Sequence, residues 1–125
     1  MKIALTTGYR ENYWGDWFTA RQIGGSERIV VELGKALARM GHEVTTRLPY
    51  EGDERTRENV RYVPHSSGQS VHDVVFAFDD YDVRDVGRRV LVACRSDPPP
   101  HTDFARLIFL SQHHATLMGH PGAPY

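Results

Sequence analysis

The sequence predicts a single α/β domain, spanning residues 1–125, built on a doubly wound parallel sheet of about six strands. The length of 125 residues and the hydrophobic content of 40% suit one core. Several short apolar runs are rich in β-branched residues and do not alternate with polar ones, which is typical of parallel strands covered on both faces. One long amphipathic segment separates the first two runs, as in a strand–helix–strand unit.

The amphipathic segment, residues 26–40, is predicted to be a helix that packs on the sheet. Ser26 is a suitable N-cap, Gly41 is a suitable residue to end the helix, and Gly34 allows close packing. Apolar positions recur at i, i+4, i+7, i+8 and i+11, which is one face of a helix. That face is expected to contact the sheet and consists of Ile29, Leu33, Ala36, Leu37 and Met40.

Strands are expected at residues 2–6, 42–48, 59–63, 74–78, 90–93 and 107–110. A charged turn is expected at 51–58, and a second helix is expected to begin within 113–118. Only residues 81–87 connect the fourth and fifth strands, so that crossover has room for at most a turn or two of helix. With these elements the expected strand order is 3-2-1-4-5-6, the order of a Rossmann-like fold.

The stretch Gly24-Gly25-Ser26 opens the predicted helix and is the first candidate binding site. The first amides of a helix have no partner within it, and they attract anions at its N-terminal end. Glycine at both positions leaves no side chain to block the approach of a phosphate or carboxylate. The same turn can also be only a tight connection between a strand and a helix, so both interpretations stay open at this point.

A cleft is expected outside the carboxyl ends of the strands, at the point where the strand order reverses. The segments expected around it are residues 7–25, 78–82 and 95–97. The first segment carries Tyr13, Trp14 and Trp17, whose aromatic faces can stack on sugar rings or other flat acceptors, although they can equally pack beneath the loop or against another domain. Arg95 and Asp97 are further candidates for the cleft.

Composition and charge narrow the classes of partner. The chain has 15 Lys and Arg residues against 16 Asp and Glu residues, so no bulk affinity for nucleic acid is expected. A single cysteine, Cys94, excludes an internal disulfide and fits a reducing compartment. No segment resembles a signal peptide or reaches membrane-spanning length, so a cytoplasmic localisation is the expectation.

Neither a metal nor a cofactor is predicted. The pair Asp80-x-Asp82 could hold a divalent cation, but acidic residues after a strand are also common helix N-caps. The seven histidines show no recognised ligand spacing. The phosphate-binding loop of nucleotide hydrolases is absent as well, since Gly34-Lys35 lies in the middle of the predicted helix and is followed by Ala36.

The run GGSERIVVEL at residues 24–33, continued by ALARMGHEVT at 36–45, resembles the first strand–helix–strand unit of family 4 glycosyltransferases. These are retaining enzymes of the two-domain GT-B type. The resemblance implies that a sugar passes from a nucleotide-diphosphate sugar to a hydroxyl acceptor, without a metal. It also implies that the donor diphosphate binds at Gly24, Gly25 and Ser26, with Glu27 in the cleft.

The resemblance covers essentially the whole chain but corresponds to half of a complete enzyme. It implies an amino-terminal, acceptor-side domain that lacks the carboxyl-terminal donor-binding domain, so the isolated chain is expected to be inactive. Family members commonly place a histidine after the strand at 90–93, where this chain has Cys94-Arg95-Ser96-Asp97. The alternative that stays open is a stand-alone Rossmann-like module that binds a nucleotide or a sugar without catalysis.

Overall fold

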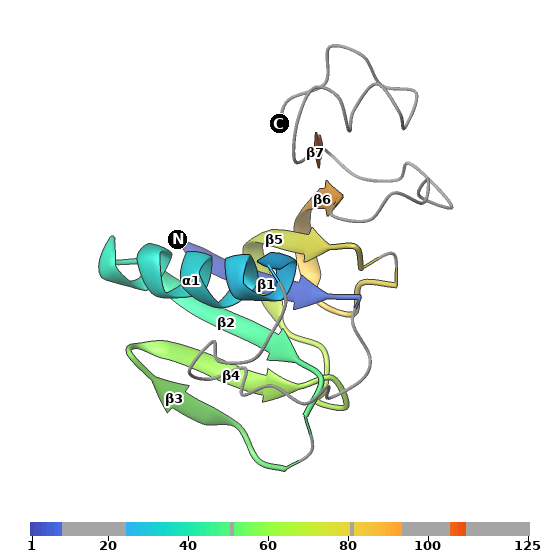
Figure 1. Cartoon of the computed structure of the whole chain (residues 1–125). Helices are drawn as coiled ribbons and strands as arrows, with labels where there is room; N and C mark the ends of the chain where they lie inside the picture. The colour runs from blue at the N-terminus through green and yellow to red at the C-terminus, as the bar shows by residue number, and fades with distance from the viewer. Residues whose placement is uncertain (9–24, 51, 81, 94–105, 110–125) are drawn as a thin grey trace.

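The computed structural model describes residues 1–8, 25–50, 52–80, 82–93 and 106–109. Its central feature is a seven-stranded sheet in the order β3-β4-β2-β1-β5-β6-β7 (Figure 1). Every neighbouring pair is parallel except β3 with β4. The elements are β1 (Lys2–Thr7), α1 (Gly25–Arg39), β2 (Glu43–Leu48), β3 (Arg55–Arg57), β4 (Val60–Pro64), β5 (Val71–Phe78), β6 (Val86–Ala93) and β7 (Arg106–Phe109).

The parallel strands follow the predicted order. The six predicted strands correspond to β1, β2, β4, β5, β6 and β7, and they lie in the sheet as 3-2-1-4-5-6. The buried apolar runs were the reason for the prediction, and they form the strands at the centre of the sheet. The α/β class and the mostly parallel sheet are therefore confirmed. The predicted helix within 113–118 lies outside the described residues.

The strand β3 corrects the charged turn that was expected at 51–58. Its three residues, Arg-Thr-Arg, are all exposed and pair with β4 in an antiparallel hairpin. The turn of this hairpin is formed by Glu58 and Asn59, which both have positive φ angles, of 51° and 63°. Such turns match the twist of a hairpin. An edge strand exposed on both sides carries no apolar alternation, so the hydrophobic pattern did not reveal it.

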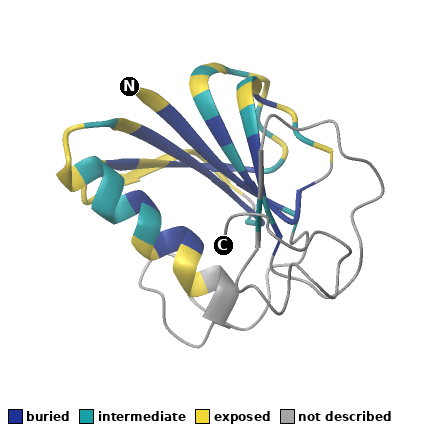
Figure 2. Cartoon of the chain, turned by 90° about the horizontal axis from the view of Figure 1, so that it is seen from above, coloured by how far each residue is buried: buried dark blue, intermediate teal, exposed yellow. Residues whose placement is uncertain are grey.

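Helix α1 covers one face of the sheet (Figure 2), and Gly41, with a φ of 95°, follows its end as predicted. The face that contacts the sheet is rotated from the predicted one. Val30 and Val31 are fully buried, whereas Met40 is 71% exposed and Ile29 is 45% exposed. Leu33 and Leu37 pack against the core from its margin.

Gly34 explains the rotation of the helix. A Cβ atom at this position would lie 3.1 Å from Leu5 Cδ1 and 3.2 Å from Thr46 Oγ1. The helix backbone therefore approaches the sheet most closely at a residue without a side chain, as the sequence suggested. Glycine contributes nothing to a pattern of apolar residues, so the predicted contact face of the helix lies too far to one side.

Val30→Ala is expected to lower the free energy of unfolding by about 2 kcal/mol, because it opens a cavity beneath the helix. Met40→Ala is the matched control and should change stability little, since the Met40 side chain is mostly in solvent. Urea unfolding of both variants measures the difference. A larger loss of unfolding free energy for the Met40 variant would support the helix face predicted from the periodicity.

The second face of the sheet is covered by extended chain at two connections. Thr46 faces α1, so the next residue of β2, Arg47, points to the opposite face. There the Arg47 side chain contacts both the β4–β5 connection, residues 65–70, and the β5–β6 connection, residues 79–85. Neither connection contains helix in its described residues.

The reach of these connections accounts for their extended form. Both must return from the carboxyl edge of the sheet to its amino edge, because the strands they join are parallel in direction. Six residues span roughly 20 Å when extended but only about 9 Å as a helix. Some of the buried side chains on this face are small. These side chains are Ala4, Thr6, Thr45 and Ala77.

Candidate functional site

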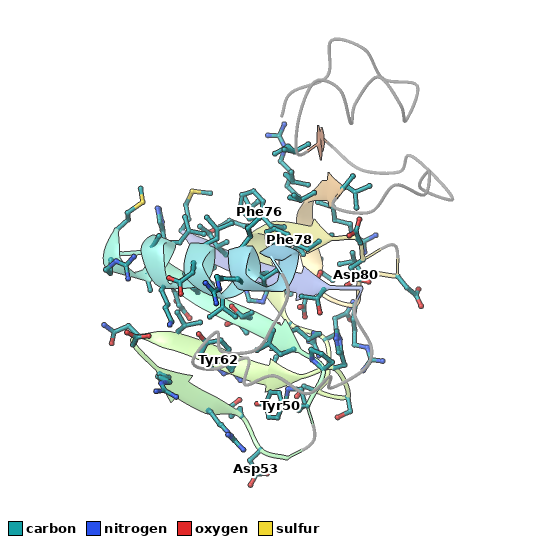
Figure 3. The ribbon with its side chains drawn as sticks, in the orientation of Figure 1. Tyr50, Asp53, Tyr62, Phe76, Phe78 and Asp80 are labelled. Atoms are coloured by element: carbon teal, nitrogen blue, oxygen red, sulfur yellow. The ribbon has the colours of Figure 1, made fainter. Side chains whose placement is uncertain are left out.

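The carboxyl edge of the central strands brings together β1, β5 and β6. The Gly8 amide, just after β1, donates a hydrogen bond to the Phe78 carbonyl at 2.9 Å. The Asp79 amide, just after β5, donates to the Val92 carbonyl at 3.1 Å. Asp80 lies at this edge, beyond the end of β5 (Figure 3). The segments that follow β1 and β5, which the sequence predicts to lie close together, are therefore in contact.

Gly8 and Asp79 pack backbone against backbone. A Cβ atom at Gly8 would lie 1.9 Å from the Asp79 carbonyl oxygen, so only glycine fits here. Asp79 itself has a φ of 50°, a left-handed conformation that non-glycine residues adopt rarely and at a cost in energy. Its side chain is only 2% exposed. The chain is held in an unusual conformation at the edge where ligands bind in sheets of this class.

Asp80 organises the start of the β5–β6 connection. Its side chain is 2% exposed, and its Oδ1 accepts a hydrogen bond from the Asp82 amide at 3.2 Å. This is the local turn that aspartate favours, and it takes the place of a helix N-cap at this position. Asp82 is exposed, in contrast to Asp80. Within the described residues, no three His, Cys, Asp or Glu side chains gather in a way that could hold a metal ion.

The Arg47 side chain makes several hydrogen bonds to the two connections. Its Nη1 donates to the Ser67 carbonyl at 2.7 Å, and its Nη2 donates to the Gly68 carbonyl at 2.9 Å. The same Nη2 lies 2.8 Å from Asp85 Oδ1, while Nε lies 3.3 Å from Asp85 Oδ2. Both side chains are almost completely buried. We refer to this ion pair and its carbonyl contacts as the Arg47–Asp85 clasp.

The Asp85 carboxylate has further donors. Ser70 donates to its Oδ1 from the amide at 3.1 Å and from the hydroxyl at 3.0 Å. The Ser70 hydroxyl also lies 2.8 Å from His72 Nε2. The clasp therefore links β2, the end of the β4–β5 connection and the end of the β5–β6 connection.

The pKa of Asp85 reflects two opposing effects. Burial raises it, but the hydrogen bonds and charge of Arg47, together with the Ser70 donors, outweigh burial and leave the pKa below its usual value of 3.8. Asp85 is therefore ionised at neutral pH. Because the folded-state pKa is lowered, its contribution to stability is complete above the unfolded-state pKa and is lost as the pH falls through the folded-state value.

A cleft of about 600 Å3 opens between the two extended connections. One wall comes from the β4–β5 connection, the other comes from the β5–β6 connection, and Arg47 contributes from the sheet between them. The lining residues are Arg47, His65, Ser66, Asp82, Val83 and Arg84. His65 is fixed at the carboxyl edge of the sheet, because its Nε2 lies 3.3 Å from Thr7 Oγ1.

The structure places part of the predicted site. Gly25, Ser26 and Glu27 form the start of α1, so the helix begins one residue before Ser26, which lies in its first turn and not at the predicted N-cap. The remaining predicted site residues lie outside the described part of the chain. They are Tyr13, Trp14, Trp17, Gly24, Arg95 and Asp97.

Sequence reasoning missed the residues of the second face, Arg47, His65 and Asp85. One signal was available, since Arg47 is the single basic residue in a strand whose last five residues are all buried. A charge inside a buried strand needs a buried partner. The identity of that partner depends on how the two connections return across the sheet, which the sequence pattern does not reveal.

Comparison with known proteins gave no similarity to report: no family model, no curated protein and no solved structure matches this chain. The described residues include no helix with the length and apolar character required to span a membrane.

Proposed function

We propose that this chain is the amino-terminal, acceptor-side domain of a retaining glycosyltransferase, with a Rossmann-like doubly wound fold. The reaction would transfer a sugar from a nucleotide-diphosphate sugar to a hydroxyl acceptor. The observation that carries the proposal is the start of α1 at Gly25, in the crossover from β1 to β2. The chain leaves β1 for β2 on one side and later adds β5 on the other, so β1 lies where the strand order reverses.

The chemistry of this helix start suits a diphosphate leaving group. The N-terminal amides of α1 carry partial positive charge, which stabilises negative charge that develops on the diphosphate as the bond to the sugar breaks. Gly25 adds no side chain to the first turn. An exposed helix N-terminus contributes only about 0.3 to 1 kcal/mol toward an anion, so the chain alone should bind diphosphate weakly, in the millimolar range.

Titration of the 15N-labelled chain with uridine diphosphate and with inorganic pyrophosphate tests this site. We expect chemical-shift changes at residues 25–27, and we expect Gly25→Val to abolish them by obstructing the phosphate. Asp80→Asn is the matched control, because an asparagine Oδ1 can still accept the hydrogen bond of the Asp82 amide. Shifts that move near residue 80 and not near residue 25 would refute the diphosphate site.

A stand-alone sugar- or nucleotide-binding module is the second candidate. It is favoured by the cleft between the two connections, which has the volume of a small-molecule site. A module that binds a sugar in this cleft should do so without any response of residues 25–27 to diphosphate. The same titration therefore separates the two functions.

A further inference from the structure

We propose that the cleft between the two connections binds a neutral ligand rich in hydroxyl groups, such as a sugar. Its role as the acceptor site rests on the proposed glycosyltransferase function, whereas its binding chemistry rests on the cleft alone. At about 600 Å3, the cleft has the volume of a typical small-molecule site. It opens beside the carboxyl edge, because one of its lining residues, His65, contacts Thr7 at the end of β1.

Hydrogen bonds hold the backbone at His65 and Asp82, and they also hold the side chains of His65 and Arg84. The His65 amide donates to the Leu48 carbonyl at 3.1 Å, in addition to the contact of its ring with Thr7. The Asp82 amide is held by the buried Asp80 carboxylate. Arg84 Nη1 donates to the Ser67 carbonyl at 3.1 Å, so this guanidinium bridges from one wall of the cleft to the other. Anchored polar groups recognise a ligand with less loss of conformational entropy than mobile ones.

The charges of the lining favour a neutral ligand over an ion. The charge of Arg47 is offset by Asp85 within the clasp. Apart from this pair, the lining residues that the structure describes carry one carboxylate, Asp82, and one guanidinium, Arg84. A phosphate would be attracted by the Arg84 guanidinium but repelled by the Asp82 carboxylate. An amine would be attracted by the carboxylate but repelled by the guanidinium. Each hydroxyl of a sugar both donates and accepts hydrogen bonds, so adjacent hydroxyls can satisfy Asp82 and Arg84 together.

The test is a 15N chemical-shift titration of the full chain with glucose, galactose, mannose and maltose, alongside inorganic phosphate. We expect at least one sugar to shift the amides of Ser66, Val83 and Arg84 saturably, with phosphate leaving them in place. Asp82→Asn and Arg84→Gln should each raise the dissociation constant about tenfold, because each removes a charge-assisted hydrogen bond. Arg88→Gln is the matched control, since Arg88 is exposed on β6 and is not part of the cleft lining.

Three results would overturn the proposal: no sugar of the panel shifts these amides, phosphate shifts them saturably, or both cleft variants bind sugar as the unsubstituted chain does. Urea unfolding of each variant ensures that a loss of binding is not a loss of folding. Failure here leaves the diphosphate response of residues 25–27 untouched, so it is distinguishable from failure of the proposed function. Sugar binding without that diphosphate response would support the cleft and refute the glycosyltransferase assignment.

Discussion

Asp85→Asn is expected to lower the free energy of unfolding by about 3 to 5 kcal/mol, since it leaves the Arg47 guanidinium buried without its counter-charge. A typical domain is stable by only 5 to 15 kcal/mol, roughly, so this is a large share of the total. Asparagine keeps the size of the side chain, which separates the loss of charge from a loss of packing. Urea unfolding at pH 7, followed by circular dichroism, measures the effect.

The matched control for this variant is Glu54→Gln. Glu54 and Arg61 also form an ion pair, but both side chains are at least half exposed. Exposed pairs are strongly screened by water, so this control should leave stability nearly unchanged. Equal effects of the two substitutions would show that burial of the Arg47–Asp85 clasp carries no energetic weight.

The acid dependence provides a second readout of the same prediction. The pKa of Asp85 is lowered in the folded chain, so the stability it contributes is present at neutral pH and declines as the pH falls below the ordinary aspartate range. The difference in stability between the unsubstituted chain and Asp85→Asn should therefore shrink as the pH is lowered from 5 toward 2. A difference that stays constant over this range would mean that ionisation of Asp85 is not its source.

Gly8→Ala is expected to cost about 3 kcal/mol or more. The new methyl group would lie 1.9 Å from the Asp79 carbonyl oxygen, which belongs to the backbone and cannot rotate away as a side chain could. The strands β1 and β5 would have to separate at the carboxyl edge. Urea unfolding measures the loss, and amide hydrogen exchange at Gly8, which donates to Phe78, reports whether this edge opens.

Gly68→Ala is the control for this substitution. A Cβ atom at Gly68 would meet no atom within 4 Å, although Gly68 also lies in a connection beside the sheet. We expect its free energy of unfolding to match that of the unsubstituted chain. If alanine at position 8 were tolerated as well as alanine at position 68, the close approach of the two backbones could not be a constraint on this fold.

Prediction from sequence succeeded where the signal is local. The strands β1, β2, β4, β5 and β6 each contain a short apolar or β-branched run, and burial on both faces of a parallel sheet favours such runs. The order of the parallel strands is the one expected for a Rossmann-like fold. The predicted orientation of α1 was wrong because apolar residues lie on both sides of Gly34. Gly34 itself comes close to the sheet, and a glycine adds nothing to a hydrophobic pattern.

The candidate site was predictable only in part, for a physical reason. The helix start at Gly25 is set by neighbouring residues, and the sequence located it within one position. The cleft and the clasp join residues far apart in the chain, such as Arg47 and Asp85, which are 38 positions apart. Their meeting depends on the path that the two connections take across the second face of the sheet, which no residue pattern expresses.

The separation of Arg47 and Asp85 along the sequence has a kinetic consequence. The clasp needs β2 and the two connections to be in place before Arg47 meets Asp85 and the backbone carbonyls of Ser67 and Gly68. The β1–α1–β2 unit, by contrast, needs only neighbouring segments and can form early. Interactions made after the folding transition state slow unfolding without speeding folding. The Arg47–Asp85 clasp should therefore set how long the folded chain survives more than how fast it forms.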